Sequence, residues 1–304
     1  MRSCDLCGGG DAAILYRDMR DTALGSDGVF GIARCARCGL VFLDPQPPPE
    51  NLARHYGSGY VPYQKSNPAV AFLKRRQWGS TERRMRRALG GKAGSVLEIG
   101  CARGEFVEFL VSRGWRAAGL EMDTDSARAA RMRGIAVREG AFEDASFGPG
   151  ERYDCIVLSY VLEHLPSPRA ALVKIRGLLS DSGIAVISIP NYESWDRKIF
   201  GRYWHGFDVP RHFYFFTRDI VRRYARETGF VLESVRYSAV PNDWIGGIAR
   251  ALRARDMNRA AAWMTYKNPV LAALLFPLSM CAALMKKSSR FMFFMRASNG
   301  DSVI

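Results

Sequence analysis

From residue 95 onward, short apolar runs alternate with segments of helical spacing. Strands that alternate with helices predict a parallel sheet with helices on both faces. The chain is therefore expected to be an α/β protein with a doubly wound sheet, which binds ligands at the carboxyl ends of its strands. The expected strands are residues 95–99, 116–121, 135–137, 153–158 and 184–189, and the expected helices are 105–111, 124–133 and 167–179.

A glycine-rich turn from Gly100 to Gly104 joins the first strand to the first helix. Such a turn brings exposed backbone N–H groups and the positive end of a helix up to a ligand. Glu121 follows about 20 residues later, where a carboxylate accepts hydrogen bonds from ribose hydroxyls. The two features together predict an adenosine-type cofactor, and at this point both NAD and S-adenosylmethionine fit them.

The composition is that of a globular and strongly basic protein. Of its 304 residues, 48% are hydrophobic and 24% are charged, and the formal net charge is +14. Such a charge favours anionic partners, namely nucleic acid, acidic lipid headgroups or phosphorylated substrates, without choosing among them. The first residues contain no apolar signal-peptide core, so we expect a cytoplasmic protein whose cysteines stay reduced.

Four of the seven cysteines form two C-x-x-C pairs, Cys4 with Cys7 and Cys35 with Cys38, each followed by glycine. Two such knuckles supply the four thiolates of a closed tetrahedral zinc site. A zinc ion held this way would stabilise a small zinc-ribbon-like lobe and catalyse nothing. Four incidental thiols, or a redox pair, are the weaker alternatives.

The segment between this lobe and the first strand divides into three pieces. Residues 43–50 are a proline-rich linker. Residues 51–65 carry aromatics among glycines and are interpreted as a lid over the main site or as an irregular packed segment. Residues 68–89 are expected to form a basic helix that covers one edge of the sheet. The expected domains are a zinc-binding lobe at 1–44, a linker, lid and covering helix at 45–94, and a cofactor-binding domain at 95–304.

Five short motifs carry a resemblance to class I S-adenosylmethionine-dependent methyltransferases, and it covers about residues 95–240. Ala102 departs from the family pattern, which commonly has glycine there, and alanine disfavours a positive φ. The resemblance implies a Rossmann-like fold with S-adenosylmethionine as the cofactor. The motifs are residues 96–104, 119–123, 140–144, 153–165 and 187–191. The cofactor contacts that it implies are Glu98, Gly100, Cys101, Ala102, Gly104, Glu121, Met122, Ala141, Phe142, Glu143 and Ser159.

The two ends of the chain add detail. A four-cysteine lobe before the catalytic domain is similar to that of some sugar methyltransferases. Residues 204–217 resemble a segment of methyltransferases that act on bacterial surface polysaccharides and lipid quinones. In these folds the sheet closes with an antiparallel edge hairpin, and residues 230–238 and 290–297 fit its two strands.

Residues 240–288 would then be a helical insertion between these two strands. Its apolar part, 270–285, is shorter than the ~20 residues that a spanning helix needs, and Pro277 interrupts it. It could lie on a membrane surface, contact a second subunit in a homodimer, or pack in the core.

Methyl transfer depends mainly on positioning, and a hydroxyl acceptor must also lose a proton. His164 follows the fourth strand and is the first candidate base. The alternative is that His164 only shapes the cofactor pocket. A second polar cluster could hold the acceptor, with Arg211 on a phosphate or carboxylate and His212 as the second candidate base. The alternative for this cluster is a hydrogen-bonded loop that packs under the sheet edge. Its members are His205, Arg211, His212 and Tyr214.

The sequence therefore predicts an S-adenosylmethionine-dependent methyltransferase that O-methylates a small-molecule, glycan or lipid-linked acceptor in cell-surface polysaccharide or lipid biosynthesis. A further expectation is contact with an anionic membrane on its cytoplasmic face. An RNA methyltransferase is the first alternative, although no recognisable nucleic-acid module is present. A non-catalytic methyltransferase-like scaffold is the second.

Overall fold

The computed structural model describes residues 3–22, 24–48, 55–56, 68–266 and 268–298. Its centre is a seven-stranded sheet with the strand order β10-β11-β8-β7-β4-β5-β6. Neighbouring strands from β6 to β8 run parallel, and β11 runs antiparallel to β8 and to β10. The strands are β4 (Ser95–Ile99), β5 (Arg116–Glu121), β6 (Val137–Glu139), β7 (Tyr153–Ser159), β8 (Leu179–Pro190), β10 (Phe230–Ser238) and β11 (Arg290–Ala297).

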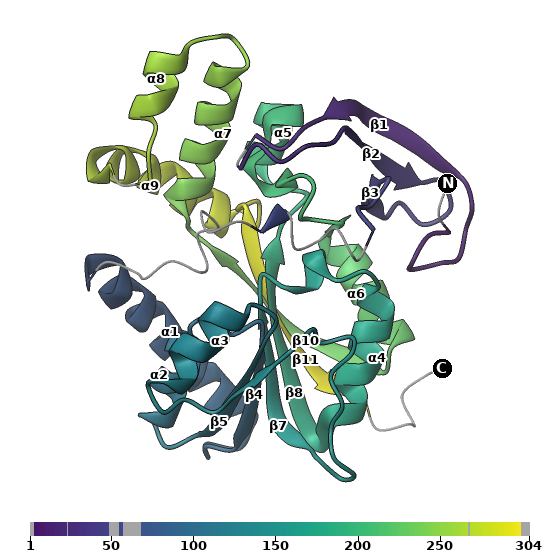
Figure 1. Ribbon diagram of the computed structural model, residues 1–304, viewed down its shortest axis with the longest axis vertical. Coiled ribbons are helices and arrows are strands. Elements are labelled where there is room, and N and C mark those ends of the chain that lie inside the picture. Colours follow the sequence, from purple (N-terminus) through teal and green to yellow (C-terminus); the bar gives the residue numbers. More distant parts are fainter. Residues whose placement is uncertain (1–2, 23, 49–54, 57–67, 267, 299–304) are drawn as a thin grey trace.

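Helices cover both faces of this sheet, as the alternation of apolar runs predicts. Figure 1 shows α1, α2 and α3 on one face and α4 and α6 on the other. Four of these helices begin at a side chain that accepts a backbone N–H, namely Asp123, Ser167, Ser194 and Thr217. The helices are α1 (Pro68–Ala88), α2 (Glu105–Val111), α3 (Thr124–Arg131), α4 (Pro168–Leu178), α5 (Trp195–Phe200) and α6 (Arg218–Glu227).

The expected fold class is confirmed, with one difference in detail. The third strand lies at Val137–Glu139 rather than 135–137, because Ile135 is buried beneath Gly104 instead of pairing in the sheet. The expected antiparallel edge hairpin is present: β10 and β11 form it, and β10 is the edge strand. The chain thus leaves the sheet after β10 and returns between β8 and β10.

The N-terminal lobe contains a four-stranded sheet whose fourth strand comes from a later part of the chain. Its own strands are β1 (Ala12–Met19), β2 (Phe30–Cys35) and β3 (Val41–Asp44), and β9 (Tyr214–Phe215) pairs with β3. Leu6 and Ile32 share one buried cluster with Leu97 and Phe215. The lobe and the large sheet therefore have a continuous core.

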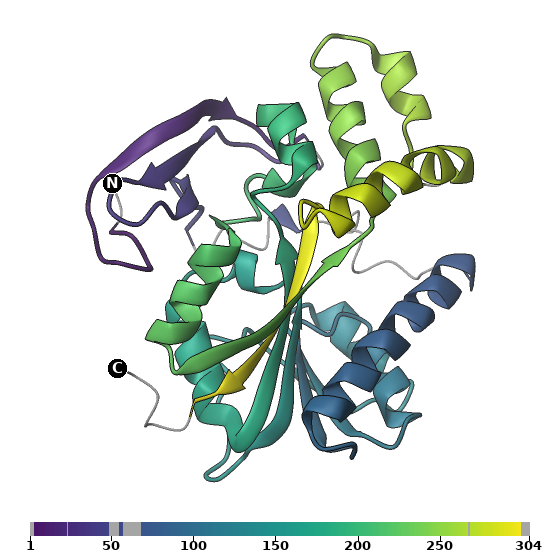
Figure 2. The same cartoon turned by 180° about the vertical axis from the view of Figure 1, so that it is seen from behind.

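The insertion between β10 and β11 folds into α7 (Pro241–Arg253), α8 (Asn258–Trp263) and α9 (Pro269–Leu284). Figures 1 and 2 show these helices and the N-terminal lobe on either side of the same end of the large sheet. Gly246 and Gly247 let α7 approach His205 and Phe200 closely, because a Cβ at either glycine would lie under 3.0 Å from those rings. Within the described residues, no helix combines the length and apolarity that crossing a bilayer requires.

Candidate active site

The turn after β4 has the left-handed backbone that its glycines predict. Gly100, Ala102 and Gly104 have φ angles of 70°, 47° and 71°. A Cβ at Gly100 would lie 2.5 Å from the Val161 side chain, so only glycine lets the end of β7 pack against this turn. Ala102 has the positive φ that alanine disfavours, at a cost of about 1–2 kcal/mol.

Glu121 lies at the carboxyl end of β5 and faces the same turn. Its side chain is 4% exposed and accepts hydrogen bonds from the backbone N–H groups of Ala102 (2.7 Å) and Asp123 (2.9 Å). Each carboxylate oxygen has two lone pairs, so both oxygens can still accept a hydroxyl proton. Burial raises the pKa of this carboxyl.

Glu98 is the second buried carboxylate beside the turn. It is 5% exposed, and its Oε2 has no hydrogen-bond partner among the described residues. Burial, and then the charge of Glu121, raises its pKa to about 8. Two acidic groups and a cradle of left-handed backbone thus meet at the carboxyl ends of β4 and β5, and they suit the hydroxyl and amine groups of an adenosine-type cofactor.

The loop after β6, residues 140–144, is fixed by Lys174. The Lys174 ammonium donates to the carbonyl oxygens of Phe142 (2.6 Å), Glu143 (3.0 Å) and Ala145 (2.8 Å). It also lies 4.9 Å from the centre of the Phe142 ring, and this ring is only 4% exposed. Phe142 therefore packs in the core, and its loop presents Ala141 and Glu143 nearer the surface.

The remaining predicted contacts differ in exposure. Cys101 is buried against Gly119, where a Cβ would lie 2.3 Å from the cysteine sulfur. Met122 is 49% exposed, and Ser159 is exposed at the end of β7.

Three side chains beyond β7 form the Glu163–His164–His212 cluster. One ligand-capable atom from each lies within 4.8 Å of the others, and the two imidazole centres are 4.6 Å apart. The Phe213 N–H donates to the Glu163 carbonyl (2.7 Å), which holds the two segments side by side. Sequence reasoning missed Glu163, although an acid between Leu162 and Leu165 is a sign of a buried carboxylate.

Hydrogen bonds fix the tautomers of both histidines. Nδ1 of His164 lies 3.0 Å from the carbonyl oxygen of Arg211 and 2.9 Å from the hydroxyl of Tyr56, and Nδ1 of His212 lies 2.8 Å from the carbonyl oxygen of Gly206. A carbonyl oxygen only accepts, so each Nδ1 carries the proton and each Nε2 keeps its lone pair. Tyr56 also places part of the expected lid at this cluster; residues 51–54 and 57–65 of that lid lie outside the described residues.

Burial sets the charge of the cluster. It lowers the pKa of His164 to about 3, with His212 as the second cause, and it lowers the pKa of His212 as well. It raises the pKa of Glu163, whose side chain is 0% exposed, to about 8. All three groups are therefore predominantly uncharged near pH 7.

Two of the predicted acceptor-binding side chains, Arg211 and Tyr214, already have partners within the protein. The Arg211 guanidinium is 1% exposed and directs all five N–H groups to Asp21, Asp208 and the His55 carbonyl. It has no donor left for a phosphate. Tyr214 donates its hydroxyl to the Pro166 carbonyl (3.0 Å).

His205 contacts other residues than those of the Glu163–His164–His212 cluster. Its Nδ1 is 3.3 Å from the Tyr266 hydroxyl, and its ring packs against α7. Burial lowers its pKa to about 4. The His205 ring therefore joins the insertion to the segment that contains His212, which matches the alternative of a hydrogen-bonded packed loop.

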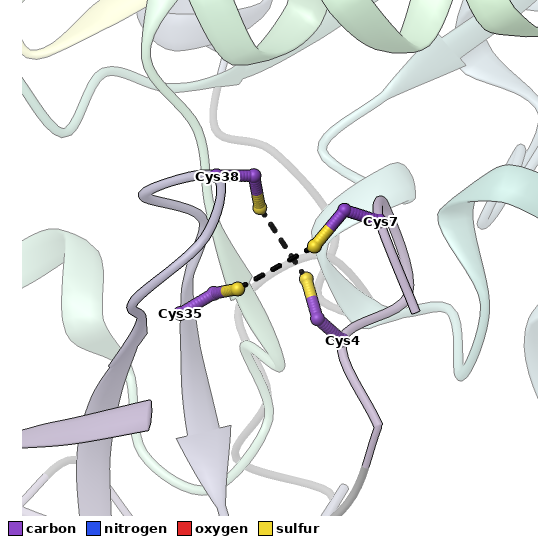
Figure 3. Close-up of side chains that lie close together, drawn as sticks. All are labelled: Cys4, Cys7, Cys35 and Cys38. Carbon is purple, nitrogen blue, oxygen red and sulfur yellow. Dashed lines mark hydrogen bonds between the residues drawn. The ribbon is translucent and has the colours of Figure 1, made fainter. Parts of the chain in front are cut away.

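The four paired cysteines converge between the first residues of the chain and the end of β2 (Figure 3). Sγ of Cys4 lies 3.5 Å from Sγ of Cys38, and Sγ of Cys7 lies 3.5 Å from Sγ of Cys35. All four sulfur atoms lie within 4.8 Å of one another. Zn–S bonds of about 2.3 Å in a tetrahedron require sulfur atoms about 3.8 Å apart, so these residues fit a zinc ion.

Comparison with known proteins agrees with this geometry. A family model described as a methyltransferase domain matches residues 72–235, which is more than half of the chain. The chain belongs to this methyltransferase family. The match confirms the resemblance to class I S-adenosylmethionine-dependent methyltransferases that the motifs predict.

The curated relatives of this methyltransferase are described as ubiquinone biosynthesis O-methyltransferases. The protein of Alkalilimnicola ehrlichii is 27% identical over 34% of this chain and 44% of its own length. The Histophilus somni protein is 24% identical over 52% of this chain and 70% of its own length. The Aeromonas salmonicida protein is 32% identical over 34% of this chain and 46% of its own length. The chain thus spans less than half of two of these three relatives.

A solved structure supports the fold of the methyltransferase. A putative sarcosine dimethylglycine methyltransferase from Galdieria sulphuraria matches with a TM-score of 0.50 and 17% identity, over 78% of this chain and 91% of that one. At this identity the match shows the shared fold alone.

The raised pKa of Glu98 predicts a pH-dependent stability. Between about pH 4.5 and 8 the unfolded chain ionises this carboxyl while the folded chain keeps it protonated, so the free energy of unfolding falls as pH rises. Glu98→Gln removes this dependence. From pH 5 to pH 8, the free energy of unfolding of the variant should rise by at least about 2 kcal/mol relative to that of the wild type, because each pH unit contributes up to ~1.4 kcal/mol. Urea unfolding at both pH values measures it.

The matched control is Asp181→Asn, which changes an exposed acid at the other end of the sheet. This variant should follow the wild-type pH profile. Parallel profiles for Glu98→Gln and the wild type would contradict the assignment.

Proposed function

We propose that the protein is an S-adenosylmethionine-dependent O-methyltransferase whose acceptor is a glycan or a lipid-linked small molecule. The observation that carries this proposal is the position of His164 and His212. Their Nε2 lone pairs lie beyond β7, and Val161, three residues before His164, packs on Gly100 of the cofactor turn. The cluster thus lies beside the place where a class I cofactor presents its methyl group.

The cofactor site is assigned to the carboxyl ends of β4, β5 and β6. The turn from Gly100 to Gly104 offers backbone N–H groups, Glu121 accepts from the ribose hydroxyls, and Ala141 to Glu143 border the adenine. The unpartnered Oε2 of Glu98 supports this assignment, because a buried acceptor without a donor fits a site for a ligand with N–H or O–H groups. When bound, the cofactor supplies an electrophilic methyl group.

The work of the protein's own residues is to hold the acceptor and to assist loss of its proton. The two imidazoles of the cluster offer only lone pairs toward the acceptor, because both Nδ1 protons are bound to carbonyl oxygens. A hydroxyl can donate to these lone pairs with its oxygen turned toward the methyl group. Holding it there supplies most of the rate enhancement in a transfer of this kind.

The acceptor class follows from the relatives and the ends of the chain. The curated relatives are described as O-methyltransferases, which favours oxygen as the methylated atom. Residues 204–217 and the four-cysteine lobe resemble parts of methyltransferases for surface polysaccharides, sugars and lipid quinones. The net charge of +14 suits an anionic acceptor or surface, and RNA remains the alternative acceptor that this charge also suits.

The four-cysteine cluster is assigned a structural zinc ion. All four ligands come from the protein, so no position is left for a substrate. Beside it, the Asp5 carboxylate accepts from Ser167, Arg169 and Tyr224. A zinc ion here would therefore fix the lobe against α4 and α6.

A membrane-facing role is assigned to α9, which is apolar on nearly every side. Only Leu271, Ser279 and Ala282 of this helix are buried. Lys286, which follows α9, is exposed, as are Arg255 and Arg259 of the same insertion. An exposed apolar helix in an insertion with exposed cations fits anionic lipid headgroups. The exposed apolar side chains are Trp263, Val270, Leu274, Phe276, Leu278, Met280, Leu284 and Met285.

The first prediction of this proposal concerns Glu121. Removing its charge-assisted hydrogen bonds should cost about 2 kcal/mol of binding, or about 30-fold in the dissociation constant. Calorimetric titration with S-adenosylmethionine should show this loss for Glu121→Ala and a smaller one for Glu121→Gln. Asp125→Asn, an exposed neighbour, should bind as the wild type does. Folded, zinc-loaded wild type that fails to bind would refute the proposal and favour the scaffold alternative.

The second prediction concerns the zinc ion. Metal analysis of the purified protein should give one zinc per chain, lost in Cys35→Ser with a fall in Tm of at least about 5 °C. Cys281→Ser changes an exposed, isolated thiol and should keep both zinc and Tm. A stable wild-type protein that contains no zinc would contradict the assignment.

The third prediction concerns α9. The protein should co-sediment with vesicles that contain phosphatidylglycerol, less so at high salt. Replacing both Leu274 and Leu284 by Gln should weaken binding at least about tenfold, since each buried side chain contributes ~1.5–3 kcal/mol. Met132→Gln, an exposed apolar residue elsewhere, is the control. Equal binding by all three proteins, or a dimer that the double variant abolishes, would overturn the membrane role.

A further inference from the structure

The Glu163 carboxylate has an unusual environment for a side chain that is 0% exposed. Neither of its oxygens has a hydrogen-bond partner among the described residues. A buried carboxylate without a partner is costly, and such groups in proteins are generally paired or bound to metal. Two imidazoles within 4.8 Å are its neighbours, so the cluster combines three metal-binding side chains of two types.

The second observation is how the two imidazoles are held. His164 and His212 each donate Nδ1–H to a backbone carbonyl, of Arg211 and Gly206 respectively. Histidines that ligate a metal are oriented by this kind of hydrogen bond, which fixes the tautomer and presents the other nitrogen to the ion. Both Nε2 atoms are thereby prepared as neutral ligands.

We propose that Glu163, His164 and His212 bind one divalent transition-metal cation, such as Mn²⁺ or Co²⁺. Two imidazole nitrogens and one carboxylate suit these ions, whereas Mg²⁺ and Ca²⁺ prefer oxygen ligands. Ligand bonds of about 2.0–2.2 Å to one ion would require the three ligand atoms to lie within about 4.4 Å of one another, close to the 4.8 Å within which they lie here. Three protein ligands leave further positions open, in contrast to the closed set of four thiolates.

The charges around the cluster are compatible with a cation. The positive group that acts on Glu163 is Arg290, whose guanidinium is paired with both oxygens of Asp243 (2.6 and 2.8 Å). The negative group is Asp208, which is paired with Arg211. Each charge is thus balanced within its own ion pair, and a cation in the cluster meets no unpaired positive charge among these groups.

The role of this cation rests on the proposed function. With the cation bound, both Nε2 lone pairs would be its ligands, so the acceptor hydroxyl would bind the cation at an open position instead of donating to the histidines. Its lowered pKa there would let it lose its proton to solvent water. The oxygen lone pair then forms the O–CH₃ bond, while the pair of the breaking S–CH₃ bond stays on sulfur. Acceptors with two neighbouring oxygen atoms, such as vicinal hydroxyls, fit two open positions best, so this is the substrate class that the site favours.

Manganese titration of the zinc-loaded full-length protein tests the site. Electron paramagnetic resonance reports free Mn²⁺, and we expect the wild type to bind one ion per chain. Glu163→Gln should weaken this binding at least about tenfold, the lower end of losses seen even for residues outside the ligand set, and His212→Gln should do the same. Glutamine has nearly the shape of a neutral carboxyl group, so the first variant preserves the packing. Asp181→Asn should bind as the wild type does.

The outcomes separate this site from the proposed function. No bound Mn²⁺, or equal binding by Glu163→Gln and the wild type, overturns the metal site. Calorimetry with S-adenosylmethionine on the same samples tests the methyltransferase reaction independently. Cofactor binding without Mn²⁺ binding would support the proposed function and refute the metal site. Glu163-dependent Mn²⁺ binding without cofactor binding would support the metal site and refute the proposed function.

Discussion

The buried guanidinium of Arg211 is the interaction on which the candidate site depends. Its five N–H groups bind Asp21 of the N-terminal lobe, Asp208 and the carbonyl of His55. Leaving such a charge buried without its partners costs about 3–5 kcal/mol. The backbone carbonyl of the same residue accepts from His164, so the ion pair that joins the lobe to the sheet also orients a histidine of the site.

This constraint explains what the sequence could and could not predict. The strands, the glycine turn and Glu121 follow from local patterns, because apolar runs and turn residues act within a few positions of one another. Asp208, one partner of Arg211, lies three positions away, but the other, Asp21, lies 190 positions away in the chain. No local pattern distinguishes an arginine that binds a distant aspartate from one that binds a phosphate, and the same holds for the Tyr214 hydroxyl.

The cofactor turn shows how a locally unfavourable residue is tolerated. Ala102 has φ of 47°, and its N–H donates to Glu121 at 2.7 Å. A charge-assisted hydrogen bond of this kind contributes about 1.5–3 kcal/mol, which is comparable to the strain of alanine in this conformation. The departure from the family's glycine is therefore compatible with the predicted cofactor site, and it weakens the one sequence argument for a non-catalytic scaffold.

The two candidate metal clusters differ in their number of ligands, and the difference fits their positions in the fold. The four cysteines lie where the lobe meets α4 and α6, and a closed zinc site there would only stabilise the lobe. Glu163 and the two histidines lie at the carboxyl end of β7, where ligands of such sheets bind, and three ligands leave room for one more group. Because Phe213 bonds both to Glu163 and, through its carbonyl, to Leu43 of β3, an ordered lobe also keeps the second cluster assembled. Loss of a zinc ion bound by the four cysteines should therefore impair the Glu163–His164–His212 cluster, even though the two clusters share no side chain.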